Sequence, residues 1–64
     1  MERNDTVKLD IDLPDDNLRK GAIGVIVEIF SKPNMAYEVE FCNSKGETIV
    51  SKVLKEDQIK LFSV

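Results

Sequence analysis

Residues 21–30 read GAIGVIVEIF, and after a short turn residues 37–41 read YEVEF. The first stretch is an apolar run that opens with two glycines, and the second alternates strictly between apolar and acidic side chains. Strict alternation is typical of a strand with one buried face, and a glycine inside a strand indicates a bulge or a close backbone approach. Together the two stretches predict a bent antiparallel sheet.

The rest of the chain continues this strand pattern. Val7, Leu9 and Ile11 alternate with polar residues and are expected to face the core. The predicted strands are residues 6–11, 22–31, 35–42, 47–53 and 59–62, with one helical turn at residues 54–58. Five short strands favour a small, strongly bent barrel over an open sheet, because closure removes exposed edges. We therefore predict an all-β fold in a single domain, residues 1–64, with residues 1–5 frayed.

Two turns carry specific expectations. Residues 12–17 form a loop rich in aspartate, which favours turns, and Leu13 and Leu18 are expected to hold this loop against the core. Gly21 is expected at positive φ in the turn before the second strand. Gly24, inside that strand, is expected at a bulge or at a close approach of another backbone.

Composition limits the classes of function. The 64 residues include nine basic and twelve acidic side chains, a net charge of −3 that opposes non-specific binding to nucleic acid and favours basic partners. There is no histidine, the side chain most used for acid–base catalysis, and the single cysteine excludes an internal disulfide. No apolar run approaches the roughly 20 residues that span a bilayer, and no signal-peptide pattern is present. We expect a cytoplasmic protein that is not an enzyme.

A set of short motifs resembles a known family. The motifs are Val7-x-Leu9, Asp12-Leu13-Pro14, Leu18-x-x-Gly21, Gly24-x-Ile26-Val27-Glu28, Tyr37-Glu38-Val39-Glu40-Phe41, Gly46-Glu47-Thr48 and Leu54-x-x-x-Gln58-Ile59. Over residues 6–61 they resemble the family called domain of unknown function 4926, of small, mostly bacterial proteins. The resemblance implies a five-stranded SH3-like barrel with a one-turn 3-10 helix before the last strand. It supplies no catalytic residues, and it implies an association with neighbouring toxin-like proteins.

Three glutamates are predicted to share one surface. Glu38 and Glu40 point to the same face of their strand, and Glu28 lies on the strand expected beside it. They form an acidic patch for a cationic partner, or else a solvated face balanced by Lys52 across the strand pair. Catalysis by these carboxylates is disfavoured, because no nucleophile or histidine accompanies them.

The aspartates of the first loop and the single cysteine are weaker candidates. Asp10, Asp12, Asp15 and Asp16 are rich in oxygen ligands, but their spacing does not match a calcium loop, so turn formation explains them better. Asp15 and Asp16 remain candidate contacts for a basic partner. Cys42 is expected to be a semi-buried filler rather than a reactive thiol. No metal or cofactor is expected.

The aromatic residues of the third strand are expected in the core. Tyr37 and Phe41 have a side chain type that stacks on nucleobases, but they share a face with Val39 and are therefore assigned to the interior.

The second strand is apolar on both faces. Ile23, Val25, Val27 and Ile29 occupy one face, and Ile26 and Phe30 occupy the other. A small barrel absorbs one face, so some of Ile26, Phe30 and the similarly placed Val50 or Leu54 are predicted to lie outside, with Ile26 and Phe30 as the candidate partner or dimer interface and burial of all of them by a curved barrel left open.

The first functional hypothesis is a non-enzymatic, acidic protein-interaction module that binds a basic protein or a second copy of itself, as an antitoxin- or immunity-like partner of a basic toxin. The alternative is a nucleic-acid-associated, KOW-like barrel, suggested by the glycine-led strand and by basic residues in the turns; the net charge disfavours it.

Overall fold

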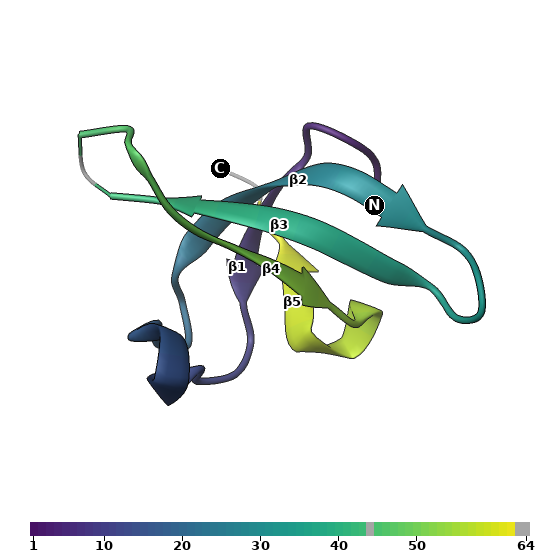
Figure 1. The fold of residues 1–64 in the computed structure, drawn as a ribbon, viewed down its shortest axis with the longest axis horizontal. Coiled ribbons are helices and arrows are strands. Elements are labelled where there is room, and N and C mark those ends of the chain that lie inside the picture. Colours follow the sequence, from purple (N-terminus) through teal and green to yellow (C-terminus); the bar gives the residue numbers. More distant parts are fainter. Residues whose placement is uncertain (44, 63–64) are drawn as a thin grey trace.

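The computed structural model describes residues 1–43 and 45–62, which form one antiparallel sheet and two single-turn 3-10 helices (Figure 1). The elements are β1 (Thr6–Leu9), η1 (Pro14–Asp16), β2 (Ile23–Phe30), β3 (Ala36–Cys42), β4 (Thr48–Leu54), η2 (Glu56–Gln58) and β5 (Ile59–Leu61). The sheet order is β4-β3-β2-β1-β5, with every neighbouring pair antiparallel. The predicted all-β class, the five strands and the 3-10 turn before the last strand are confirmed.

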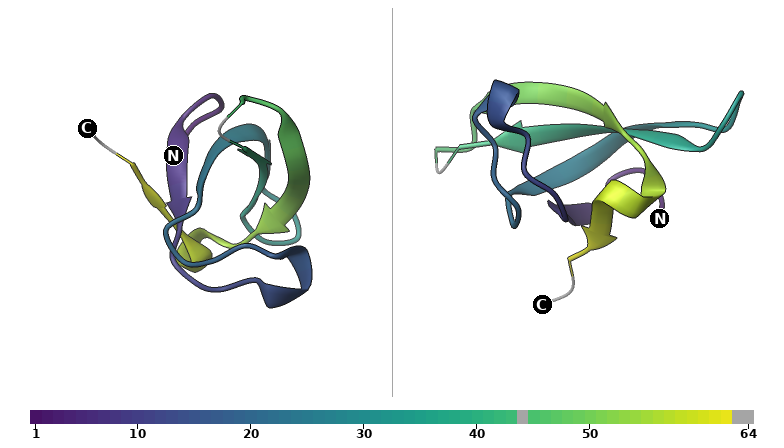
Figure 2. Two further views of the ribbon diagram at one scale, coloured as in Figure 1. Left: turned by 90° about the vertical axis from the view of Figure 1, so that its left-hand side faces the viewer. Right: turned by 90° about the horizontal axis from the view of Figure 1, so that it is seen from below.

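The sheet is strongly curved. Seen end-on, its strands curl around a common interior (Figure 2, left). The short η2 connects β4 to β5, and β5 pairs with β1 through Leu9 and Ile59. The SH3-like barrel that the resemblance implies stays a prediction. Within the described residues there is no helix of the length and apolarity needed to cross a bilayer.

The core is built from the inward faces of these strands. Residues 37, 39 and 41 of β3 are at most 2% exposed, which confirms the inward face predicted from the YEVEF stretch and the core assignment of its aromatic residues. Ile11 is partly buried against the same cluster. Cys42 follows the inward Phe41 and therefore points outward; it is exposed, so its assignment as a semi-buried filler is wrong. The core residues are Val7, Leu9, Leu18, Ile26, Tyr37, Val39, Phe41, Leu54 and Ile59.

Gly24 lies where β2 and β3 pack most closely. A Cβ atom at this position would lie 2.6 Å from Cγ1 of Val39 and 2.8 Å from the carbonyl oxygen of Glu40. Cβ atoms essentially never make contacts this short, so only glycine fits without displacing a neighbour. The close approach predicted for Gly24 is confirmed.

The bulge in β2 lies further along the strand and changes which residues face inward. In the register with β3, Ile26 pairs with Val39, but the next pair is Glu28 with Glu38, so one residue is inserted between them. Gly24 and Ile26 therefore face the interior before the bulge, whereas Ile29, which pairs with Tyr37, faces it afterwards.

This change corrects the predicted faces of the second strand. Ile26 is 0% exposed and Ile23 is 42% exposed, the reverse of the prediction. The physical reason is that the interior beside Phe41 has room for a glycine only, so Gly24 faces inward and Ile26 follows it two residues later. Ile26 is a core residue, and its assignment to a partner interface is wrong.

The loop between β1 and β2 is held as predicted. An isolated β-bridge joins Leu13 to Leu18, and Leu18 is buried. One turn of 3-10 helix, η1, lies between them where only a loop was expected. Gly21 adopts φ +97°, as predicted for the turn before β2.

Candidate functional site

Three glutamates gather on the outer face of the sheet. Because Tyr37, Val39 and Phe41 face inward, Glu38 and Glu40 between them point outward. Glu28 of β2 pairs directly with Glu38, so the two residues are cross-strand neighbours on this face; the Glu28 carboxylate is directed to Arg3 and accepts a hydrogen bond from the backbone amide of Ile29, and the Glu38 carboxylate accepts one from Ser51 of β4. The structure thus brings together the three glutamates singled out from the sequence, and we call this surface the acidic face.

The neighbours of the acidic face neutralise it only in part. Nη2 of Arg3 lies 3.4 Å from Oε2 of Glu28, in an exposed pair whose side chains are 64% and 44% accessible. The hydroxyl of Ser51 donates a hydrogen bond of 3.2 Å to Glu38. Within the described residues, Glu38 and Glu40 have no ion-pair partner. Of the three carboxylates, only that of Glu28 is therefore paired with a cationic side chain within the described residues.

Lys52 does not balance the acidic face. It pairs with Val39 and so belongs to the inward face of β4, together with Val50 and Leu54. Its Nζ lies 3.0 Å from Oδ2 of Asp16 in η1. The predicted charge balance across β3 and β4 is wrong, because the strand alternation sends Lys52 to the other side of the sheet from Glu38 and Glu40.

The aspartates of the first loop lie apart from the acidic face. Asp16 contacts Lys52 from the inner side of the sheet, while Asp15 is exposed on the same short helix. The structure therefore separates Asp15 and Asp16 from the three glutamates with which they were grouped. Among the described residues, no group of three or more His, Cys, Asp or Glu side chains could hold a metal ion.

An apolar groove lies next to the acidic face, at the end of the sheet where β2 turns into β3. It is formed by Phe30, Pro33, Met35, Ala36 and Val53, and we call it the apolar groove. Three of these side chains are strongly exposed: Phe30 at 40%, Met35 at 44% and Val53 at 58%. Phe30 thus lies outside the core, in contrast to Ile26.

Sequence reasoning missed the remainder of this groove. Val53 pairs with Glu38 and therefore shares the outer face, which could have been found only by knowing the register between β3 and β4. Pro33 and Met35 belong to the turn, where strand alternation gives no direction.

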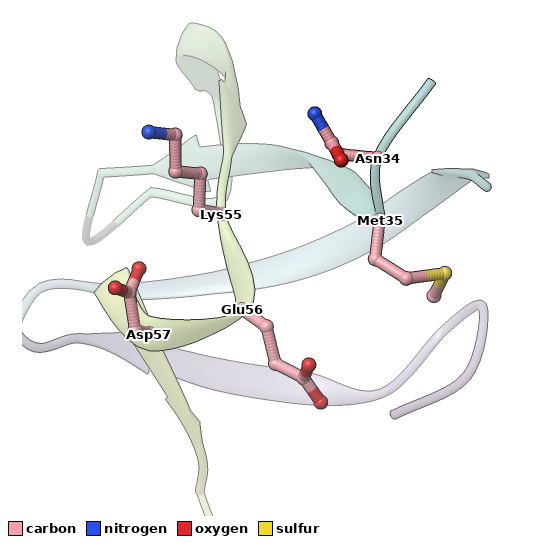
Figure 3. Close-up of a pocket in the computed structure, with 5 residues that line it drawn as sticks. All are labelled: Asn34, Met35, Lys55, Glu56 and Asp57. Atoms are coloured by element: carbon pink, nitrogen blue, oxygen red, sulfur yellow. The ribbon is translucent and has the colours of Figure 1, made fainter. Parts of the chain in front are cut away.

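A second hollow adjoins the groove on the side of η2. It is lined by Asn34 and Met35 from the β2–β3 turn, by Lys55 between β4 and η2, and by Glu56 and Asp57 of η2 (Figure 3). The charged ends of these side chains point in different directions and do not converge on one point (Figure 3). The hollow continues the groove toward η2 through the three residues that line both, Asn34, Met35 and Lys55.

Comparison with known proteins gives one result. Residues 3–61 match the family described as Domain of unknown function (DUF4926), whereas no curated protein and no solved structure matches the chain. The match spans nearly the whole sequence and includes every strand described above. The chain therefore belongs to the DUF4926 family.

Proposed function

We propose that this protein is a non-enzymatic interaction module of the cytoplasm that binds a basic protein through its acidic face, as an antitoxin- or immunity-like neutraliser of a basic toxin. The observation that carries the proposal is the direct pairing of Glu28 with Glu38. Like charges that face one another across two strands destabilise a sheet. A cationic side chain docked between them converts that repulsion into attraction, so the arrangement favours a basic partner.

The free edge at β4 is a poorer docking site than the outer face. β4 is an edge strand, and such strands are open to pairing with another chain. However, its pairing with β3 is interrupted by a bulge between Phe41 and Cys42, and Lys52 points a charge inward from it. Bulges and inward charges are features that oppose added strands. They support docking on the outer face.

The nucleic-acid alternative has less support, because the acidic face and the net charge of −3 both repel a polyanionic backbone.

The proposal is tested by removing the acidic face without changing the core. We expect the triple variant Glu28→Gln, Glu38→Gln and Glu40→Gln to bind the partner at least about tenfold more weakly than the unmodified chain. The partner is first isolated from the source cells on the immobilised chain and identified by mass spectrometry. Binding of the purified partner is then measured by calorimetry, and the affinity should fall as salt is added.

A second triple variant is the matched control. Asp12→Asn, Asp15→Asn and Glu47→Gln remove the same number of negative charges from the first loop and the β3–β4 turn, outside the acidic face and the apolar groove, and the new amides keep the acceptor oxygens at positions 12 and 47. This variant should retain most of the affinity. The proposal fails if both triple variants weaken binding equally, or if the partner that binds is an acidic protein or an RNA.

The repulsion between Glu28 and Glu38 has a consequence for the free protein. Glu38→Gln removes it while the amide can still hydrogen-bond with Ser51, so we expect the free energy of unfolding to rise by about 0.2–1 kcal/mol. Urea denaturation at low salt measures the change. Glu56→Gln, which removes one charge from η2, is the control and should change stability less. A loss of stability in Glu38→Gln would contradict the assigned repulsion.

A further inference from the structure

From the acidic face toward the β2–β3 turn, the outer surface changes from acidic to apolar and then to basic. Along β2 and into the turn, Glu28, Phe30 and Lys32 follow one another at two-residue spacing. In the β3 register Glu28 pairs with Glu38, and Phe30 pairs with Ala36. The outer surface is therefore acidic over Glu38, apolar over Ala36 and basic beyond it.

The basic end comes from two lysines that line the apolar groove, Lys32 from the β2–β3 turn and Lys55, which lies between β4 and η2. Both are exposed, and neither takes part in an ion pair within the described residues. The groove thus lies between Glu38 and the two lysines, none of which has an ion-pair partner among the described residues, and Glu56 and Asp57 of η2 line the hollow beyond Lys55. The β2–β3 turn, which supplies several residues that line the groove, extends past the other strands (Figure 1).

We propose that the apolar groove is the anchor subsite of the partner interface: it takes one bulky apolar side chain from an extended segment of the basic partner. Basic side chains of that segment reach the acidic face on one side of the anchor, and an acidic side chain reaches Lys32 and Lys55 on the other. This inference rests on the proposed function, because it assigns the acidic face to the same partner.

The strand geometry sets the spacing of the partner's side chains. Residues two apart on a strand are separated by about 6.6 Å and point to the same side. An extended segment running along β3 with its apolar side chain over Ala36 therefore places its residues two and four positions away over Glu38 and Glu40. A residue two positions away in the other direction lies over the turn, toward Lys32.

Exposure of the groove favours an apolar anchor. Phe30 and Val53 together present a concave apolar surface, and Met35 adds a flexible side chain that adapts to different shapes. Interfaces concentrate their binding energy where a large apolar or aromatic side chain fills such a pocket inside a polar rim. Here the rim is supplied by Glu28 and Glu38 on one side and by Lys32 and Lys55 on the other.

The test uses two capped synthetic peptides of identical composition. In the first peptide, a tryptophan is followed by lysines two and four positions later and preceded by a glutamate two positions earlier. Threonines occupy the positions between them. In the second, the tryptophan and the glutamate exchange places. Each is titrated into the isotope-labelled protein and followed by NMR. We expect the first peptide to shift the backbone amide signals of Phe30, Ala36 and Val53, and to bind more tightly than the second.

Val53→Thr tests the groove itself. It exchanges one methyl group for a hydroxyl at nearly constant shape, so the first peptide should bind about fourfold more weakly, as expected for the loss of roughly one methylene of apolar contact. Ile49→Thr is the matched control: Ile49 is 56% exposed on the same strand but does not line the groove, and its substitution should leave the affinity unchanged.

The outcomes separate this inference from the proposed function. If Glu38→Gln weakens peptide binding but Val53→Thr does not, the anchor subsite is wrong and the acidic face stands. If Val53→Thr weakens binding but Glu38→Gln does not, the groove binds apolar side chains without the acidic face, and the proposed function fails. If the groove signals shift on concentrating the protein alone, a second copy occupies the groove and the inference is overturned.

Discussion

Replacing Gly24 with valine is expected to lower the free energy of unfolding by about 3 kcal/mol, the upper end of the cost of overpacking a core. The added side chain would meet Val39, the carbonyl oxygen of Glu40 and Cδ1 of Phe41, all at 3.0 Å or less from its first atom. A domain of this size has only about 3–10 kcal/mol of stability, so much of it would be lost. Urea denaturation followed by circular dichroism measures the change.

Gly21→Ala is the control for this substitution. Gly21 has φ +97°, but a Cβ atom there would meet nothing within 4 Å. Its cost comes from backbone conformation alone and should be about 1 kcal/mol. Equal losses at the two glycines would mean that β3 moves away readily, and that the close contact at Gly24 does not exclude larger side chains.

Ile26→Ala is expected to cost about 2–5 kcal/mol of stability, as is typical for truncation of a buried aliphatic side chain. Ile26 is 0% exposed and pairs with Val39 in the middle of the core. Ile23→Ala removes the same atoms from the same strand at a side chain that is 42% exposed, and it should cost less than about 1 kcal/mol.

The comparison of these two variants also tests the bulge. If Ile23→Ala were the more destabilising change, β2 would have the faces predicted from its sequence, with Ile26 on the surface. Thermal unfolding monitored by circular dichroism distinguishes the two results.

The sequence was sufficient for β3 and insufficient for β2, and the reason is physical. In β3, Tyr37, Val39 and Phe41 alternate with glutamates. Because burial of an unpaired charge is costly, this alternation indicates that the apolar face is the buried one. In β2 nearly every residue from 23 to 30 is apolar, so the pattern carries no information about direction. The faces of β2 are decided by its neighbours, through the lack of space at Gly24 and the extra residue before Glu28.

The candidate site, like the strands, was predictable from the sequence only in part. Glu28, Glu38 and Glu40 were placed together correctly because adjacency of β2 and β3 follows from their short connection. Lys52 was assigned to the wrong face because the apolar residues of β4 lie on both sides of it, and only the register with β3 shows that it points inward. The apolar groove could not be predicted, since it combines a turn with the ends of two strands that are distant in the sequence.

The bulge in β2 also restricts how the β2–β3 hairpin can form. Before the bulge β2 buries even-numbered residues, Gly24 and Ile26, and after it an odd-numbered residue, Ile29. A shift of the whole strand by one residue would therefore turn the buried residues of both halves outward. Such a shift would bring a branched side chain, Ile23 or Val25, to the position where only glycine fits. We therefore expect a steric clash at the position of Gly24 to disfavour misaligned β2–β3 hairpins and so to limit errors of strand alignment during folding.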